Sequence, residues 1–168
     1  MSKRNAILLV GSKFIGGGGA YGLIEILWRG FTHISMIILG GICFIGLLHI
    51  SKYNEVRFPL IFKRRGNQKK TRVGENLSSA KTYGLKLNMV SKSIIGGAMI
   101  TAAELLAGIV LNIWLRLDIW DYSGERFQVL GQICFKYFFL WCGLSFVVIA
   151  GCRLARWALK PKEARSSG

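Results

Sequence analysis

The sequence predicts an all-α integral membrane protein, in which four transmembrane helices form two hairpins within a single membrane domain, residues 1–168. First, 52% of the 168 residues are hydrophobic and the mean hydropathy is +0.40, which is too apolar for an ordinary soluble domain. Second, the net charge of +15 comes from basic residues that cluster between the apolar segments. Positive charge placed in this way is typical of membrane topology, so we expect no nucleic-acid partner.

The first hairpin is expected to have spans at about 6–28 and 34–50. An apolar segment of the first length is sufficient to cross the ~30 Å hydrocarbon layer with some tilt. Residues 31–33 form a turn that is too short to hold a domain. The second span contains Gly40, Gly41 and Gly46, small residues that permit close contact between helices.

The segment 51–86 is expected to be a basic cytoplasmic loop, because it holds ten Lys and Arg residues against only Glu55 and Glu75. One interpretation is a flexible linker between the two hairpins. The other is an interfacial anchor, in which the short apolar stretch 56–62 lies on the membrane and the basic residues bind anionic lipid headgroups.

The second hairpin is expected to have spans at about 87–115 and 127–151, followed by a basic cytoplasmic tail at 152–168. A segment that mixes charged and aromatic residues separates these two spans. Most Lys and Arg residues fall in the start of the chain, the 51–86 loop and the tail. The positive-inside rule therefore places both termini in the cytoplasm, in agreement with an even number of spans.

An internal match supports the division into two hairpins. Residues 39–44 read Leu-Gly-Gly-Ile-Cys-Phe, and residues 130–135 read Leu-Gly-Gln-Ile-Cys-Phe. The two copies lie two spans apart, so we interpret them as a parallel repeat about an axis along the membrane normal.

Small residues and a glutamate recur at offsets of four and seven in the first and third spans, and such offsets stay on one helical face. The formal dinucleotide fingerprint that begins at Gly17 lies inside a span, without the strand or the water-facing backbone that a pyrophosphate needs. Close helix packing explains these glycines better. The residues assigned to packing are Gly18, Gly22, Gly97 and Gly108.

Intramembrane carboxylates are the main candidates for function, because each is costly unless it faces protein or water. Glu25 and Arg29 are spaced for an ion pair along one helix, which would simply anchor the helix end. Glu104 has no Lys or Arg within a turn. The functional alternative is that Glu25 and Glu104 line one polar site for a cation, a proton or a substrate amine. Two neighbouring carboxylates would not both ionise easily, which favours proton coupling.

Arg29 is a candidate binding residue near the outer mouth of such a site. Three further polar residues, Asn112, Asp121 and Gln132, are candidates for the same region. They would either form an outward-facing vestibule or hydrogen-bond a structured loop. The histidines and cysteines show no metal-ligand spacing, and the cysteines are interpreted as small buried hydrophobic residues. No cofactor is expected, and the absence of a nucleophile set gives an enzymatic role no support.

The segments 21–33, 39–44, 112–123 and 130–134 together resemble the bacterial family of putative ABC-transporter type IV permeases, which are small proteins of four or five spans. The resemblance covers much of the first hairpin and most of the second, and it implies a multi-pass protein of the bacterial inner membrane. The basic insert at 57–84 departs from the short connection usual in that family. No nucleotide-binding motif is present in the sequence, so a transport role implies a separate ATPase, for which the basic loop would be the docking site.

Two functions therefore follow as hypotheses. The first is a small transporter or permease-like subunit whose intramembrane carboxylates line a polar site, and we expect it to be a homo-oligomer because four short helices leave little room for a private pathway. The second is a membrane adaptor or scaffold, without transport activity, whose basic loop binds anionic lipid or a partner protein.

Overall fold

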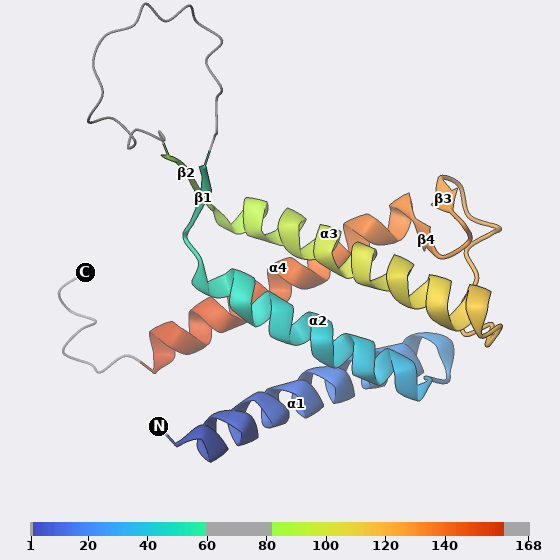
Figure 1. The fold of residues 1–168 in the computed structure, drawn as a ribbon, viewed down its shortest axis with the longest axis horizontal. Helices are drawn as coiled ribbons and strands as arrows, with labels where there is room; N and C mark the ends of the chain where they lie inside the picture. The colour runs from blue at the N-terminus through green and yellow to red at the C-terminus, as the bar shows by residue number, and fades with distance from the viewer. Residues whose placement is uncertain (1, 60–81, 160–168) are drawn as a thin grey trace, which may run out of the picture.

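The computed structural model describes residues 2–59 and 82–159, and within them it confirms the all-α fold with four helices long and apolar enough to cross a membrane (Figure 1). The helices are α1 Lys3–Arg29, α2 Ile34–Lys52, α3 Met89–Gly108 and α4 Phe135–Ala158. A π-helical segment, η1 Ile109–Trp114, continues α3. The chain is therefore a multi-pass membrane protein.

Local sequence explains where three of the helices begin or end. Gly30 ends α1 in the left-handed region at φ 81°, which glycine adopts without a steric penalty, and its N–H donates to the Ile26 carbonyl. The His33 ring accepts a hydrogen bond from the Ser35 N–H at the start of α2. Asn88 caps α3 in the same way, with 2.7 Å between its Oδ1 and the Ser91 nitrogen.

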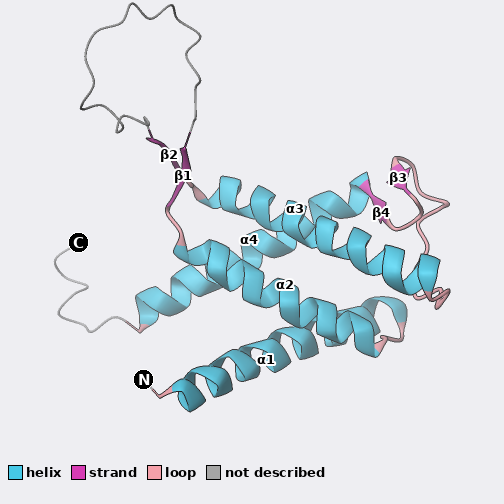
Figure 2. Cartoon of the chain, viewed as in Figure 1, coloured by secondary structure: helices cyan, strands magenta, loops and turns pink. Residues whose placement is uncertain are grey.

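Three of the expected spans agree with the structure to within a few residues, whereas the fourth is displaced toward the C-terminus. Residues expected to open that span instead form a short hairpin of β3 Gln128–Val129 and β4 Ile133–Cys134 (Figure 2). Leu130 and Gly131 both have positive φ, 54° and 67°, and a helix cannot contain two such residues. Helix α4 then continues into the expected tail.

The hairpin also removes structural support for the sequence repeat. Residues 39–44 lie within α2, whereas residues 130–132 form the β3–β4 turn and Ile133 and Cys134 form β4, before α4 starts at Phe135. The same six-residue pattern therefore occupies two different conformations. A repeat of whole hairpins remains a prediction.

The two hairpins pack through α2. Helix α1 packs against α2, α3 packs against α4, and α2 also contacts both α3 and α4. One buried cluster, Cys43, Leu47, Ile100 and Trp141, joins the three helices α2, α3 and α4. Large apolar side chains outside these contacts are exposed along the helices, as expected of surfaces that face lipid, among them Ile7, Leu27, Phe139 and Val147.

The four helices define two ends of the bundle. We call the end that holds Lys3, Lys52, Met89 and Ala158 the termini end, and the end that holds residues 30–33 and 115–134 the loop end (Figure 1). At the termini end, strands β1 Glu55–Pro59 and β2 Thr82–Lys86 pair antiparallel and lead away from the helices. The central part of the predicted basic loop lies outside the described residues, as does the tail beyond residue 159.

Candidate functional site

Glu25 is a buried carboxylate at the loop end of α1, and its hydrogen-bonding capacity is largely used. Arg29 Nη1 lies 2.8 Å from one carboxylate oxygen, and the Thr32 hydroxyl donates to the other. The second guanidinium nitrogen of Arg29 donates to the carbonyl of Ile119, at 2.7 Å. The pair therefore ties α1 to the loop that follows η1, as in the anchoring interpretation of these residues.

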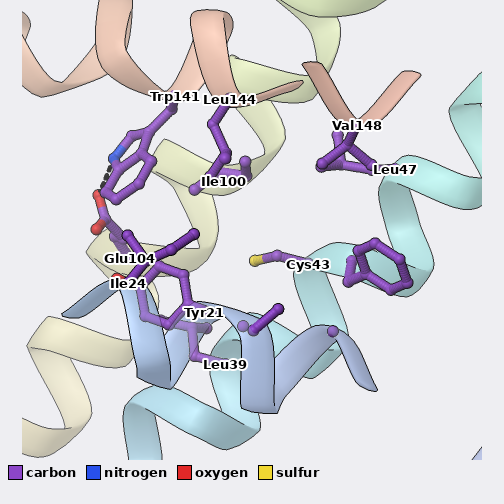
Figure 3. Close-up of a pocket in the computed structure, with 14 residues that line it drawn as sticks. Tyr21, Ile24, Leu39, Cys43, Leu47, Ile100, Glu104, Trp141, Leu144 and Val148 are labelled. Atoms are coloured by element: carbon purple, nitrogen blue, oxygen red, sulfur yellow. Dashed lines mark hydrogen bonds between the residues drawn. The ribbon is translucent and has the colours of Figure 1, made fainter. Parts of the chain in front are cut away.

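Glu104 lies in a different environment. Its residue surface is only 3% exposed, and one carboxyl oxygen accepts a hydrogen bond from Trp141 Nε1 at 2.6 Å (Figure 3). Among the described residues, no Lys or Arg forms an ion pair with it. Glu104 is therefore a membrane-embedded carboxyl group without a counter-charge in the described part of the chain.

Glu104 lines a small, partly open cavity of about 110 Å³ between the four helices, which we call the inner cavity. Figure 3 shows Tyr21 on the α1 side of this cavity and Trp141 on the α4 side, with the indole N–H of Trp141 directed at the carboxyl group. Their ring centroids are 6.2 Å apart and the ring planes meet at 44°. Apart from Glu104 and the Tyr21 hydroxyl, the lining is apolar or contributes a thiol, that of Cys43.

A larger cleft of about 670 Å³ adjoins this cavity at the loop end, between α1 and α4. Four residues line both spaces, namely Tyr21, Ile24, Trp141 and Leu144. Glu104 is the charged residue among the described lining of the inner cavity, whereas the cleft is lined by four charged side chains. These are Glu25, Arg29, Asp121 and Glu125.

The two predicted carboxylates therefore do not share one cavity. Glu104 lines the inner cavity and Glu25 lines the cleft, with Tyr21 in the wall common to both. The helix faces of α1 and α3 that carry these glutamates and the nearby glycines also do not contact each other. A Cβ on Gly18 or Gly22 would contact Ile37 of α2, whereas one on Gly97 would contact Cys142 of α4. Each face packs on the other helix of its own hairpin.

Asn112 and Gln132 support the loop at the loop end, and neither lines the cavity or the cleft. The Asn112 amide donates to Gln132 Oε1 at 2.7 Å and to the Trp120 carbonyl at 2.9 Å, while its oxygen accepts from the Ile119 N–H. Gly108 permits this approach, because a Cβ there would collide with the Gln132 side chain. Of the two interpretations of these polar residues, the geometry favours a hydrogen-bonded loop.

Asp121 and Tyr122 lie where this loop meets the cleft. Asp121 is exposed, and hydrogen bonds from the hydroxyl and then the N–H of Ser123 lower the pKa of its carboxyl group. Tyr122 stacks on Tyr137 with 4.7 Å between ring centroids, and burial, followed by the charge of Glu104, raises the pKa of its phenol. Of the predicted mouth residues, Arg29 and Asp121 are charged and line the cleft, and Asp121 is the acidic one.

Sequence reasoning predicted the contact of Glu25 with Arg29 but overlooked one further partner of each carboxylate. Thr32 donates to Glu25 from beyond the end of α1 at Arg29, and Trp141 donates to Glu104 from another helix, so helical spacing does not reveal either contact. The position of Trp141 carried a signal. Tryptophan is enriched at the ends of membrane helices, and a tryptophan well inside an apolar span needs an acceptor for its N–H.

Comparison with known families gives one match. A family model described as putative ABC-transporter type IV matches residues 29–159, which includes α2, α3, α4 and the end of α1. No curated protein and no solved structure matches the chain at a significant level.

Proposed function

We propose that this chain, which belongs to the family described as putative ABC-transporter type IV, is a transport subunit in which Glu104 binds the cationic group of a small organic substrate. The family description supports a transport-related membrane role. The carboxyl group of Glu104 supports the site, because it is buried beside a cavity with one described hydrogen-bond donor and no described counter-cation. An ionised carboxylate in that position is costly, so it favours either a proton or a bound cation.

The walls of the cavity favour an alkylammonium ion. Tyr21 and Trp141 both line the cavity, and aromatic faces attract cations. The remaining lining suits an apolar body. Calcium and magnesium ions take six or more oxygen ligands, and this cavity offers one carboxyl group, so its chemistry fits them less well.

The cleft provides the route to this site in the proposed mechanism. Asp121 places negative charge at its mouth, which raises the local concentration of cations, whereas the charge of Glu125 is paired with Lys136 at 3.2 Å. Glu25 contributes little to that field because Arg29 neutralises it. A change in the Tyr21 rotamer would join the cleft to the inner cavity, since this side chain lines both.

Two partners complete the proposal. The family description makes a separate ATPase a reasonable partner, because no nucleotide-binding motif occurs in this sequence. A second copy of the chain would close the cleft, which opens between α1 and α4. We place this assembly in the cytoplasmic membrane of a bacterial cell, with both chain termini on the cytoplasmic side, as the distribution of Lys and Arg predicts.

Tetramethylammonium is a suitable probe, because it is small and permanently charged. We expect the purified chain to bind it, and Glu104→Gln to weaken binding by more than about tenfold, because Glu104 is the only charged side chain among the described residues that line the cavity. Binding is measured by the change in tryptophan fluorescence on titration, with Trp141→Phe identifying the reporting ring. The matched control is Asp118→Asn, which removes a carboxylate from the exposed loop and keeps a residue that tolerates its φ of 46°.

Flux of radiolabelled tetramethylammonium into proteoliposomes gives the second measurement. The proposal requires faster uptake than in protein-free vesicles, and a loss of that difference in Glu104→Gln but not in Asp118→Asn. Equal binding and equal uptake by the Glu104→Gln variant and the unmodified chain would exclude the carboxylate mechanism. Absence of any binding by the unmodified chain would exclude this substrate class.

A further inference from the structure

A second cavity, of about 620 Å³, lies at the termini end of the bundle and carries a strong positive charge. Its lining brings together the start of α3, the end of α2 and the last turns of α4. Lys92, Arg153 and Arg156 contribute three cations, and none of the described residues that line the cavity is a carboxylate. This site is separate from Glu104 and does not depend on the proposed function.

The burial of Lys92 indicates that its ammonium group has a fixed position at this cavity and is not a freely solvated surface group. It is 6% exposed, although lysine is rarely buried without a partner of opposite charge. Its ammonium group has two neutral acceptors, the Asn54 Oδ1 at 3.1 Å and the Ser51 carbonyl at 3.4 Å. Arg153 and Arg156 line the same cavity as Lys92 and bring two further positive charges to it.

Arg156 is oriented by the same carbonyl. Its guanidinium donates to the Ser51 carbonyl at 3.1 Å and to the Ser51 hydroxyl at 3.2 Å. These contacts with neutral groups fix the position of the arginine but leave its charge uncompensated. Arg153 lines the same cavity, and no hydrogen bond or ion pair holds it among the described residues.

The start of α3 adds to the positive potential. Asn88 caps the Ser91 N–H, but the Met89 and Val90 N–H groups in the first turn have no helical carbonyl to accept them. Both residues line the cavity, so the positive end of the helix dipole faces the three cations. Three positive side chains and the N–H groups of the first turn of α3 therefore surround this cavity, and an anion bound in it would neutralise their charge.

We infer that this cavity binds a phosphate group. Arginine and lysine side chains together with a helix N-terminus are the donors that phosphate oxygens require. The cavity lies where four apolar spans end, which is the level of lipid headgroups, and buried Ile149 forms an apolar part of its wall. The phosphate therefore comes either from an anionic phospholipid or from a soluble phosphate compound.

Binding to the full chain in detergent distinguishes these sources. The probes are phosphatidylglycerol, phosphatidylcholine with the same acyl chains, and inorganic phosphate, with bound lipid counted by native mass spectrometry and stabilisation followed as a shift in Tm. Preferential binding of phosphatidylglycerol assigns the site to an anionic lipid. Stabilisation by inorganic phosphate without that preference assigns it to a soluble ligand.

Variants locate the binding within the chain. Arg153→Gln is expected to weaken binding about fivefold to tenfold, because one of three cations is lost, whereas Arg153→Lys keeps the charge and most of the affinity. Lys52→Gln is the matched control, since Lys52 is exposed at the same end but does not line the cavity. Arg153 makes no described contact that folding would depend on. Failure of all three probes to bind, or equal losses in Arg153→Gln and Lys52→Gln, would overturn the inference.

Discussion

Arg29 joins the first hairpin to the loop that follows η1, because one guanidinium contacts Glu25, the Ile119 carbonyl and the face of Phe31. The carboxylate of Glu25 is buried, and the guanidinium is about a quarter exposed, at 27%. In such a pair, removal of one partner is more harmful than removal of both, because it leaves a buried charge uncompensated.

We therefore predict that Arg29→Gln lowers the free energy of unfolding by about 2–4 kcal/mol. The double variant Glu25→Gln/Arg29→Gln should be more stable than Arg29→Gln alone. Thermal or denaturant unfolding in detergent measures both differences. A double variant less stable than Arg29→Gln would contradict the role given to this pair.

At Asp121, the prediction concerns pH. Hydrogen bonds from Ser123 lower the pKa of this exposed carboxyl group in the folded state. The turn it stabilises is therefore fully formed above the ordinary aspartate pKa of about 3.9, and the stabilisation is lost as the pH falls through the lowered value. An NMR titration of the carboxyl carbon should give a midpoint below about 3.9, and Ser123→Ala should raise that midpoint.

At the scale of helices, contact between α1 and α2 depends on Gly18, because a Cβ there would collide with the carbonyl oxygen of Ile37. Gly19, the next residue, has nothing within 4 Å of the corresponding position. We predict that Gly18→Ala destabilises the protein by about 1–3 kcal/mol, whereas Gly19→Ala is neutral or slightly stabilising. Unfolding of the two variants side by side is the measurement, and equal stability would contradict this packing.

The β3–β4 hairpin contains a strained residue. Leu130 occupies the left-handed region at φ 54°, and with Gly131 it forms the two central positions of the turn. Asparagine tolerates this conformation better, so Leu130→Asn is expected to stabilise the chain by about 1 kcal/mol. Leu130→Ala, which removes the same apolar surface but keeps the strain, is the control and should show no gain in Tm.

For the whole molecule, the charge distribution predicts that both termini face the cytoplasm. A fluorescent protein fused after residue 168 should be fluorescent in a bacterial host, and alkaline phosphatase at the same position should be inactive. Phosphatase fused within the loop after Asp118 should be active, because that loop lies at the opposite end of the bundle. The reverse pattern would invert the orientation and place the phosphate cavity on the outer side.

The sequence by itself determined the class of the molecule. Four apolar segments of sufficient length can only cross a membrane as helices, because every backbone polar group must find its partner within the segment. The pair of Glu25 and Arg29 was equally predictable, since helical spacing of four residues brings the two groups together. The hydrogen-bonded loop that contains Asn112 and Gln132 was predicted only as one of two alternatives.

Only the tertiary structure decided what surrounds the carboxylates and the cations. Glu104 accepts a hydrogen bond from Trp141 of another helix. Lys92 and Arg156 both donate to the Ser51 carbonyl, from which they lie 41 and 105 residues away along the chain. The tertiary structure also sets the residue at which α4 begins. Residues in the left-handed conformation and the hydrogen bond of Gln132 with Asn112 stabilise the β3–β4 hairpin before it. Such contacts depend on how helices pack, and packing joins residues whose spacing in sequence carries no information.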